Sequence, residues 1–365
     1  MAPTLLIGSC EPFSGKSAVG LGLARQLLRA GVPLRFGKPL ATALQGEPLP
    51  SGEPLLDADV RFVGATLGLA EDRLIPSLHV LEPEGAGRRL LAAELDPGPG
   101  FEQLREQLAA APAGELALLE AAGSLHEGLL YGLSLAQLSE GLEAAVLLVH
   151  LWSDSSSVDA LLAARAALGD RLVGVVLNAV NPDGVAELRQ QVAPALARLG
   201  IPVLGVMPRS PLLRSVTVEE LARRLGAQVL CCRDRIDLLV ETLSIGAMNV
   251  NSAMEFFRRR RNMAVVTGAD RTDIQLAALE ASTQCLILTG AGDPLPQLVI
   301  RAEELEVPLL KVDQDTLTTV EVIEQAFGHV RLHQAVKATY AVRLVEEHCD
   351  FSGLFQRLQL AVPAG

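Results

Sequence analysis

The chain has 365 residues, 49% hydrophobic and 20% charged, which is enough apolar sequence for packed cores and more than one ordinary domain. Its net charge of −12 disfavours a nucleic-acid-binding role, because such domains carry a basic face. The sequence contains no apolar run of membrane-spanning length and no signal peptide, and its five cysteines have no zinc-like spacing. We therefore expect a cytoplasmic protein with neither a membrane nor a nucleic-acid partner.

The first part of the chain alternates short apolar runs with segments of helical period. The apolar runs cover residues 4–9, 34–39, 116–122, 144–151, 172–180 and 202–208. Helical patterns cover residues 17–31, 157–169 and 185–200. Strands that are apolar on both faces are typical of parallel sheets covered by helices. The pattern predicts an α/β domain with a doubly wound parallel sheet over residues 1–226.

A second, shorter series of strands and helices follows. Its apolar runs cover residues 227–232, 262–269, 284–291 and 307–313, with helical patterns at 271–281 and 296–306. These elements predict a smaller α/β domain over residues 227–335. The remaining residues, 336–365, form an amphipathic pattern, which predicts a helical tail that closes the structure or makes a subunit contact.

The loop after the first predicted strand is a candidate phosphate site. Its sequence, GSCEPFSGKS, runs from Gly8 to Ser17 and is two residues longer than the common pattern G-x-x-x-x-G-K-[ST]. The backbone N–H groups at the start of the next helix favour phosphate oxygens. Lys16 would reach the β- and γ-phosphates, and the Ser17 hydroxyl would bind Mg²⁺. The alternative is an ordinary strand-to-helix turn.

Several ordered motifs resemble a known family. GSCEPFSGKS, FGKPLAT, LLEAAGSLHEG, GVVLNAV and GVMPRSPLL resemble the dethiobiotin synthetase-like P-loop domain, and more closely the N-terminal domain of long bacterial phosphate acetyltransferases, which has a lengthened loop. VVTGADRTDIQLAALEA is similar to the DRTGG domain that follows it there. The resemblance extends to about residue 335 and implies ATP and Mg²⁺ as ligands. The chain ends where the acetyltransferase catalytic domain would begin, so we expect no acetyltransferase activity.

The loop and the resemblance together give a predicted nucleotide site. Its residues are Gly8, Glu11, Pro12, Ser14, Gly15, Lys16, Ser17, Lys38, Asn178 and Pro208. The resemblance implies that Lys38 lies near the transferred phosphate, that Asn178 reads the adenine edge and that Pro208 lies beside the base. The alternatives are an exposed lysine after a strand for Lys38 and a turn-forming residue for Asn178.

Four residues are candidates for a magnesium site: Ser17, Asp57, Asp59 and Glu120. Glu120 ends a predicted central strand, where an acidic ligand opposite the loop belongs. Asp57 and Asp59 would supply a second carboxylate or would cap the following helix. After Glu120, Ala121 and Ser124 replace two glycines of the synthetase pattern E-G-A-G-G, which disfavours ligase activity.

Two turns of the second domain are candidate ligand sites. One contains Asp270, Arg271 and Thr272, and the other contains Gly290 and Asp293. Both follow predicted parallel strands, so they would border one crevice at the same sheet edge. The alternative interpretation is structural: Asp270 would cap a helix, and both segments would be tight turns.

Three functions are consistent with these features. The first is an ATP-binding regulatory or sensor protein, in which Mg-nucleotide binding is coupled to a metabolite or protein partner of the second domain. The second is an ATP-dependent carboxylate or carbamate ligase resembling dethiobiotin synthetase. The third is a structural oligomerisation module with a vestigial loop. We expect a homo-oligomer in each case, and at most a slow ATPase or ligase.

Overall fold

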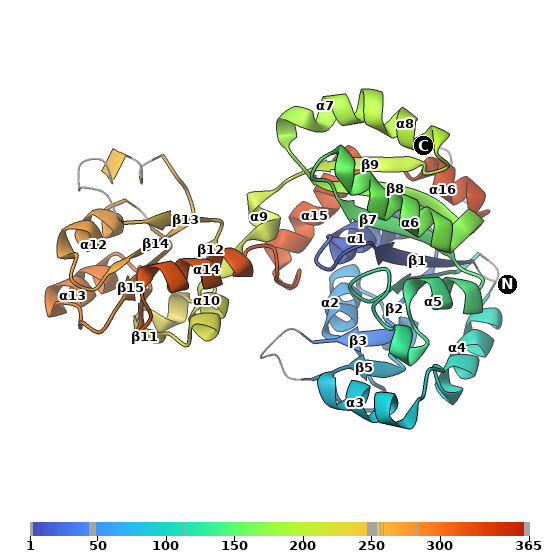
Figure 1. Ribbon diagram of the computed structural model, residues 1–365, viewed down its shortest axis with the longest axis horizontal. Coiled ribbons are helices and arrows are strands. Elements are labelled where there is room, and N and C mark those ends of the chain that lie inside the picture. Colours follow the sequence, from blue (N-terminus) through green and yellow to red (C-terminus); the bar gives the residue numbers. More distant parts are fainter. Residues whose placement is uncertain are drawn as a thin grey trace. The chain divides into compact units, whose positions relative to one another are not determined.

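The computed structural model describes residues 3–43, 49–112, 114–246, 254–255, 257, 259–281 and 283–360 (Figure 1). The chain divides into two compact units, Met1–Arg209 with Arg331–Gly365, and Ser210–Val330. The second unit is therefore inserted into the first. The predicted boundaries lay at 226/227 and 335/336, and residues 336–360 of the predicted tail belong to the first unit. The last five residues of that tail lie outside the described part of the chain.

A seven-stranded sheet forms the centre of the first unit. Its order is β4-β2-β6-β1-β7-β8-β9, and all its pairings are parallel. The strands are β1 (Thr4–Ser9), β2 (Leu34–Gly37), β4 (Leu74–Ile75), β6 (Leu116–Glu120), β7 (Ala145–Leu151), β8 (Leu172–Val180) and β9 (Val203–Pro208). A small parallel pair consists of β3 (Leu40–Thr42) and β5 (His79–Leu81). The predicted α/β fold with a parallel sheet is confirmed.

Helices pack on both faces of this sheet. The helices of the first unit are α1 (Lys16–Arg29), α2 (Ala58–Leu67), α3 (Pro83–Ala92), α4 (Pro99–Ala109), α5 (Leu135–Gly141), α6 (Val158–Leu168), α7 (Val185–Glu187), α8 (Ala193–Arg198), α15 (Ala335–His348) and α16 (Ser352–Arg357). None of the described helices has both the length and the apolar character needed to cross a membrane.

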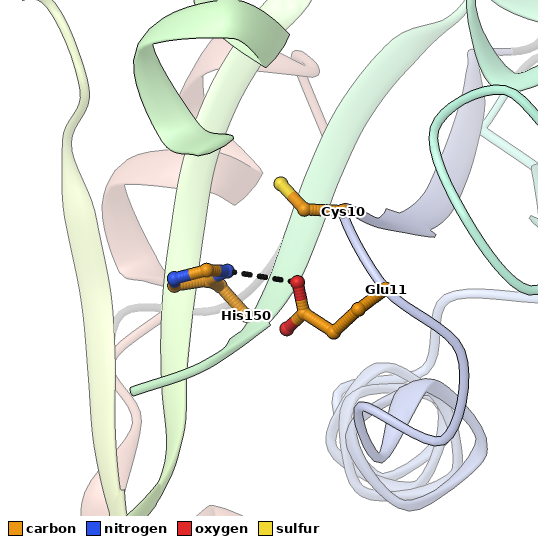
Figure 2. Close-up of side chains that lie close together, drawn as sticks. All are labelled: Cys10, Glu11 and His150. Atoms are coloured by element: carbon orange, nitrogen blue, oxygen red, sulfur yellow. Dashed lines mark hydrogen bonds and ion pairs between the residues drawn. The ribbon is translucent and has the colours of Figure 1, made fainter. Parts of the chain in front are cut away.

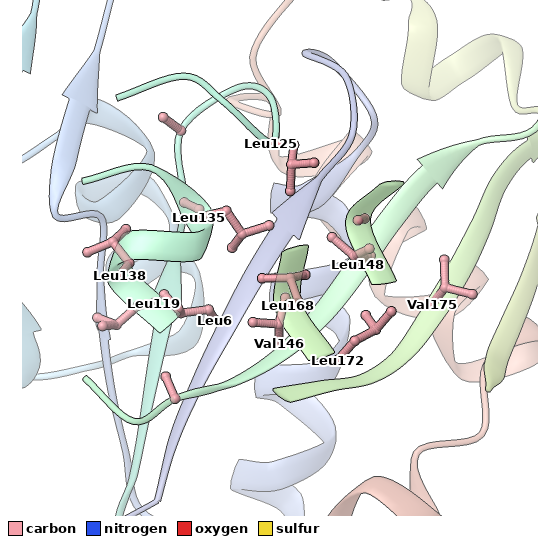
Figure 3. Close-up of a cluster of buried hydrophobic side chains, with 14 of the residues drawn as sticks. Leu6, Leu119, Leu125, Leu135, Leu138, Val146, Leu148, Leu168, Leu172 and Val175 are labelled. Carbon is pink, nitrogen blue, oxygen red and sulfur yellow. The ribbon is translucent and has the colours of Figure 1, made fainter. Parts of the chain in front are cut away.

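The core on one face is built from alternate residues of the central strands. Leu6, Val146 and Leu148 pack there with Leu135 of α5 and Leu168 of α6 (Figure 3). All five side chains are at most 1% exposed, so this face is fully shielded from water.

The tail helix α15 packs directly against α1. The contact is close at Gly22, where an added Cβ would lie 2.5 Å from the Cβ of Val345. A glycine is therefore needed for the two helices to approach at this point. Helix α15 of the tail therefore belongs to the first unit.

The second unit contains a five-stranded sheet of order β11-β16-β15-β14-β13. Its strands are β11 (Gln228–Cys231), β13 (Thr242–Ile245), β14 (Met263–Gly268), β15 (Cys285–Thr289) and β16 (Leu309–Val312), and β11 alone runs antiparallel to its neighbour. A separate pair consists of β10 (Val216–Thr217) and β12 (Leu239–Val240). The helices are α9 (Pro211–Arg214), α10 (Val218–Leu225), α12 (Thr272–Leu279), α13 (Pro296–Glu304) and α14 (Thr316–Ala326).

Alternate residues of β14 point into two different cores. Ala264 and Val266 join the apolar cluster that includes residues of α10 and α14. Met263 and Val265 join the cluster that includes residues of α12 and α13. The period-two pattern of a strand therefore buries both faces of this sheet under helices.

Candidate functional site

The loop between β1 and α1 is held in place by Asn178. Its side-chain amide donates a hydrogen bond of 2.7 Å to the backbone oxygen of Ser14. Gly15 caps α1 with a φ of 95°, and a Cβ at this position would lie 2.4 Å from the Asn178 amide nitrogen. Both the left-handed backbone and the close approach favour glycine here. The loop therefore depends on the pair Gly15 and Asn178.

Lys16 and Ser17 begin α1 beside the end of β6. The Lys16 ammonium donates to the Ser9 hydroxyl at 3.1 Å and to the backbone oxygen of Gly123 at 3.0 Å. The Ser17 hydroxyl donates to Oε1 of Glu120 at 3.1 Å. This proximity follows from the sheet, because β1 pairs with β6 and Glu120 lies opposite Ile7 in the register. Three predicted site residues, Lys16, Ser17 and Glu120, thus lie together.

Burial perturbs both charged groups of this cluster. Burial lowers the pKa of the Lys16 ammonium, although the nearby Glu120 carboxylate acts in the opposite direction. Burial also raises the pKa of the Glu120 carboxyl, although the Lys38 ammonium opposes that shift. A hydroxyl and a carboxylate that lie side by side supply the hard oxygen ligands that Mg²⁺ prefers. The residues present therefore fit a magnesium ion that also binds phosphate oxygens.

Lys38, Asp57 and Asp59 form a second, buried cluster in the same unit. The Lys38 ammonium lies 2.9 Å from Oδ2 of Asp59 and 3.2 Å from Oδ2 of Asp57. Asp57 also caps α2, because its carboxylate accepts from the backbone N–H groups of Asp59 at 2.7 Å and Thr42 at 2.8 Å. The helix-capping alternative therefore holds for Asp57. In this conformation the Lys38 ammonium forms ion pairs with the Asp57 and Asp59 carboxylates.

Two residues that sequence reasoning missed complete this cluster. Arg331 donates to Oδ2 of Asp59 and to the backbone oxygen of Thr42, each at 2.6 Å. Nε2 of His333 lies 3.0 Å from Oδ1 of Asp59, and its ring stacks on Phe62 with centroids 5.0 Å apart. No local signal could have identified Arg331, because 272 residues separate it from Asp59.

The charges of this cluster compensate one another. Burial alone would raise the pKa of the Asp59 carboxyl, but Lys38, His333 and Arg331 outweigh it and hold that pKa well below its usual range. Likewise, burial alone would lower the pKa of the Lys38 ammonium, but the Asp59 and Asp57 carboxylates raise it. We therefore expect Lys38 and Asp59 to be charged at neutral pH.

The other predicted residues of the nucleotide site lie in different surroundings. Oε2 of Glu11 lies 3.2 Å from Nδ1 of His150, and Pro12 is exposed on the loop. Gly8 lies against Leu135 so closely that a Cβ would overlap its side chain. Pro208 is the last residue of β9 and is half-buried.

Glu127 contacts the segment after β6. Its carboxylate accepts a hydrogen bond from the backbone N–H of Gly123. The Gly123 backbone thus has both polar groups engaged, its N–H by Glu127 and its oxygen by Lys16.

The two predicted turns of the second unit lie next to each other. The backbone N–H of Ala269 donates to the oxygen of Thr289 at 2.9 Å, and a Cβ at Gly292 would lie 3.5 Å from that of Ala269. The expected cap at Asp270 is wrong, because α12 begins at Thr272 with Arg271 as N-cap and no side-chain cap bond. The helix starts one residue later than the capping pattern requires.

Arg271 and Asp293 of these turns already have ionic partners. Nε of Arg271 lies 3.3 Å from Oδ1 of Asp273, and Nζ of Lys311 lies 2.6 Å from Oδ1 of Asp293. Gly290, directly after β15, has a φ of 90°. The turns of Asp270–Thr272 and Gly290–Asp293 therefore border one sheet edge, and Arg271 and Asp293 are paired in this conformation.

The parallel sheet, the glycine-capped loop and the Lys16–Ser17 start of α1 define a P-loop domain. A family profile described as an AAA domain matches residues 3–217, and a profile described as a DRTGG domain matches residues 220–326. The chain belongs to this AAA-domain family and carries a DRTGG domain. The resemblance stated from the motifs is thereby confirmed.

The curated relatives belong to two groups. A phosphate acetyltransferase of Nitratidesulfovibrio vulgaris (strain Hildenborough) is 25% identical over 98% of this chain and 52% of its own length. An ATP-dependent dethiobiotin synthetase of Pseudomonas aeruginosa (strain LESB58) is 31% identical over 57% of this chain and 90% of its own. The chain spans about half the length of the acetyltransferase, at 52%.

Solved structures resemble parts of the chain. The CBS and DRTGG domains of the regulatory region of Clostridium perfringens pyrophosphatase, complexed with its activator diadenosine tetraphosphate, cover 30% of this chain and 47% of that one, with 21% identity and a TM-score of 0.28. The signal recognition particle receptor FtsY of Elizabethkingia anophelis, in complex with GDP, covers 57% of each chain, with 13% identity and a TM-score of 0.34.

Proposed function

We propose that the chain is an ATP-dependent sensor, whose first unit binds Mg–ATP and whose DRTGG domain binds a metabolite or a protein partner. The observation that carries the proposal is the Ser17–Glu120 hydrogen bond of 3.1 Å beside the buried Lys16. A hydroxyl, a carboxylate and an ammonium meet at the start of a helix, where backbone N–H groups favour phosphate oxygens.

The binding step requires a rearrangement of hydrogen bonds around Lys16. In this conformation its ammonium donates to Ser9 and Gly123. A bound β- or γ-phosphate would replace these neutral acceptors with charged oxygens, which accept stronger hydrogen bonds. Ser17 and Glu120 would hold the magnesium ion, which neutralises phosphate charge. The nucleotide thus gains its affinity from groups that are already close together.

The sensing step is supported by the position of Arg331 in the chain. This residue directly follows Val330, the last residue of the second unit, and its guanidinium lies 2.6 Å from Asp59. Asp59 in turn contacts Lys38. A phosphate that drew Lys38 away would remove one positive charge from beside Asp59 and so change the strength of the Asp59–Arg331 ion pair. By linkage, if a bound nucleotide changes the affinity for a ligand that shifts Arg331, that ligand changes the nucleotide affinity by the same factor.

A ligase is the second candidate, because a dethiobiotin synthetase is 31% identical to this chain over 57% of its length. In the synthetase pattern the segment after the acidic residue is rich in glycine. Here Ala121 and Ser124 replace two of those glycines, and the Gly123 N–H is occupied by the Glu127 carboxylate. A substrate would have to displace Glu127 before it could use that N–H group, which favours the sensor over the ligase.

The test is calorimetric titration of Mg–ATP into the full chain, with phosphate release followed in the same samples. Lys16→Ala is the test variant, and Arg29→Ala is the control at the exposed end of the same helix. We expect saturable binding that Lys16→Ala abolishes and Arg29→Ala preserves, with little phosphate release. Light scattering of the same samples tests the expected homo-oligomer.

Three other results would change the assignment. Rapid phosphate release, or release stimulated by a small carboxylate or amine, would favour the ligase. Equal binding by Lys16→Ala and the unmodified protein would refute the phosphate role of the loop. If neither protein bound nucleotide, the structural oligomerisation module would become the better explanation.

A further inference from the structure

We propose that Cys10, Glu11 and His150 form a binding site for a thiophilic divalent cation, with Zn²⁺ as the expected ion. One ligand atom from each residue lies within 4.8 Å of the other two. Figure 2 shows the three side chains gathered between the loop after β1 and the end of β7. This site is separate from the Ser17–Glu120 pair, and the proposal does not depend on nucleotide binding.

The sheet explains why these residues meet. Ser9, the last residue of β1, pairs with Val149 of the neighbouring parallel strand β7. Cys10 and Glu11 follow Ser9 directly, and His150, the second-last residue of β7, follows Val149, so all three residues lie at the same end of the two strands. The arrangement is therefore set by the backbone of the central sheet, which is a rigid support for a site.

The side chains are held near one another by a few contacts. Nδ1 of His150 lies 3.2 Å from Oε2 of Glu11, and the Glu11 carboxylate also accepts from the backbone N–H of Leu151. The Cys10 thiol donates a weak hydrogen bond of 3.5 Å to the backbone oxygen of Ala160. The thiol therefore has no strong partner to lose when it turns toward a metal ion.

His150 is the most buried member of the group, at 2% exposure. Its Nε2 has no hydrogen-bond partner among the described residues, so Glu11 is the ring's one polar contact in that part of the chain. Buried imidazoles usually have both nitrogens satisfied. The nitrogen that faces Glu11 is Nδ1, so Nδ1 is the atom of this buried ring that can bind a metal ion between the carboxylate and the Cys10 thiol (Figure 2).

The donor set selects the class of ion. A thiolate, an imidazole and a carboxylate are the three ligand types that zinc takes, and three protein ligands plus one water complete a tetrahedral site. Magnesium and calcium prefer oxygen ligands and are disfavoured by the thiol and the ring nitrogen. When the ion binds, the Cys10 thiol releases its proton to water and the sulfur coordinates as thiolate.

The distances are compatible with such a site after side-chain rotation. Bonds of about 2.0–2.3 Å in a tetrahedron place ligand atoms roughly 3.3–3.8 Å apart. The three ligand atoms all lie within 4.8 Å of one another, so the side chains need to approach by at most about 1.5 Å. Cys10 and Glu11 are half-buried on a loop, where a χ1 rotation can supply this movement without moving the sheet.

The experiment uses the full chain without a histidine tag, reduced and stripped of metals with a chelator. Co²⁺ is titrated as a spectroscopic substitute for Zn²⁺. We expect one Co²⁺ per chain, with the strong visible absorption of a tetrahedral site and a sulfur-to-cobalt charge-transfer band, both removed by stoichiometric Zn²⁺. No charge-transfer band in the unmodified protein would overturn the proposal.

Cys10→Ser is the test variant, because it preserves size on a half-buried loop and is expected to fold. Cys232→Ser, at a half-buried thiol of the second unit, is the matched control. Cys10→Ser should lose the charge-transfer band. Its Co²⁺ affinity should fall by more than the roughly 10–100-fold that is lost when a residue hydrogen-bonded to a metal ligand is replaced. Cys232→Ser should retain both. A band that persists in Cys10→Ser would refute this site.

Glu11→Gln provides a second check that does not alter the thiol. We expect it to keep the charge-transfer band and to bind Co²⁺ more weakly, because a neutral amide is a poorer ligand than a carboxylate. Affinity unchanged in Glu11→Gln would exclude Glu11 as a ligand and contradict the three-residue site. Circular dichroism of each variant confirms that the fold is retained.

Discussion

The carboxylate of Asp59 and the guanidinium of Arg331 lie 2.6 Å apart, although one residue precedes the inserted unit and the other follows it. The side chains of both are at most 10% exposed. Lys38 and His333 contact the same carboxylate. Each of these three partners helps to compensate the buried negative charge of Asp59, because an uncompensated charge in the protein interior costs free energy.

Arg331→Ala is therefore expected to destabilise the first unit. Removal of one partner of a buried ion pair costs about 3–5 kcal/mol, and the remaining contacts of Asp59 with Lys38 and His333 reduce this to about 2–4 kcal/mol. Urea unfolding at pH 7 measures the difference. Arg29→Ala removes a solvent-exposed pair with Glu346 and should change the stability little. Equal effects of the two substitutions would contradict the structural role of Arg331.

The same pair predicts a pH dependence. The folded-state pKa of Asp59 is well below its unfolded value of about 3.9, so its stabilising contribution is complete above that value and is lost as the pH falls further. Arg331→Ala should move that loss to higher pH. Unfolding free energies measured between about pH 2 and 7 should therefore converge for the two proteins at the acid end. A constant difference across this range would exclude Asp59 as the titrating group.

Gly15→Ala should disrupt nucleotide binding without unfolding the protein. The added methyl would displace the Asn178 amide from Ser14 and force a non-glycine residue to a φ of 95°. We expect the Mg–ATP affinity to fall more than tenfold, as measured by calorimetry. Gly31→Ala is the control, because Gly31 has a φ of 78° and no atom within 4 Å of an added Cβ. Equal loss in both variants would assign the effect to backbone strain alone.

Asn178→Ala tests whether this residue reads the base or supports the loop. Its amide donates to Ser14 of the loop, so we expect ATP and GTP affinities to fall by similar factors. Loss of one neutral hydrogen bond of about 0.5–1.5 kcal/mol corresponds to a roughly 2–13-fold decrease in affinity. Calorimetry with both nucleotides gives the two factors. A loss restricted to ATP would instead support the adenine contact that the sequence resemblance implies.

Lys337→Met should stabilise the protein at neutral pH. Lys337 lies on α15 at 1% exposure, and burial lowers the pKa of its ammonium to about 8. The unfolded value is about 10.4, so the folded form binds this proton more weakly, at a cost of up to about 3 kcal/mol below pH 8. Between the two pKa values the unfolded chain binds more protons than the folded chain, so wild-type stability rises with pH.

The advantage of Lys337→Met is therefore expected to be largest below pH 8 and to disappear by about pH 10.4. Urea unfolding of both proteins at pH 7, 9 and 10.5 measures it. An advantage that is independent of pH would show that the methionine acts by packing and not by removal of a buried charge.

Much of the fold could be predicted from the amino-acid pattern. The buried strands β1, β6, β7 and β8 correspond to apolar runs in the sequence. A strand covered by helices on both faces does not show the alternation of apolar and polar residues that is typical of a half-exposed strand. The direction of β11 could not be read in this way. Gln228–Cys231 runs antiparallel to β16, and strand direction depends on pairing between segments that are distant in sequence.

The candidate site was only partly accessible to sequence reasoning. Lys16, Ser17 and Glu120 belong to motifs with fixed spacing, so their proximity could be anticipated from the order of the strands. Arg331 and His150 have no such motif. Arg331 contacts Asp59 only because the tertiary structure brings these distant parts of the sequence together. His150 lies near Cys10 only because β7 pairs with β1.

The insertion of the second unit affects how the protein is made on the ribosome. Helix α15, which packs on α1, is synthesised only after all of residues 210–330. Helix α15 begins 306 residues after α1 ends at Arg29, so at about 5–20 residues per second the apolar surface of α1 waits roughly 15–60 s for this partner. The inserted unit can fold during that interval, whereas the earlier unit must remain incomplete. The face of α1 that packs on α15 therefore stays uncovered by that helix until α15 has been synthesised.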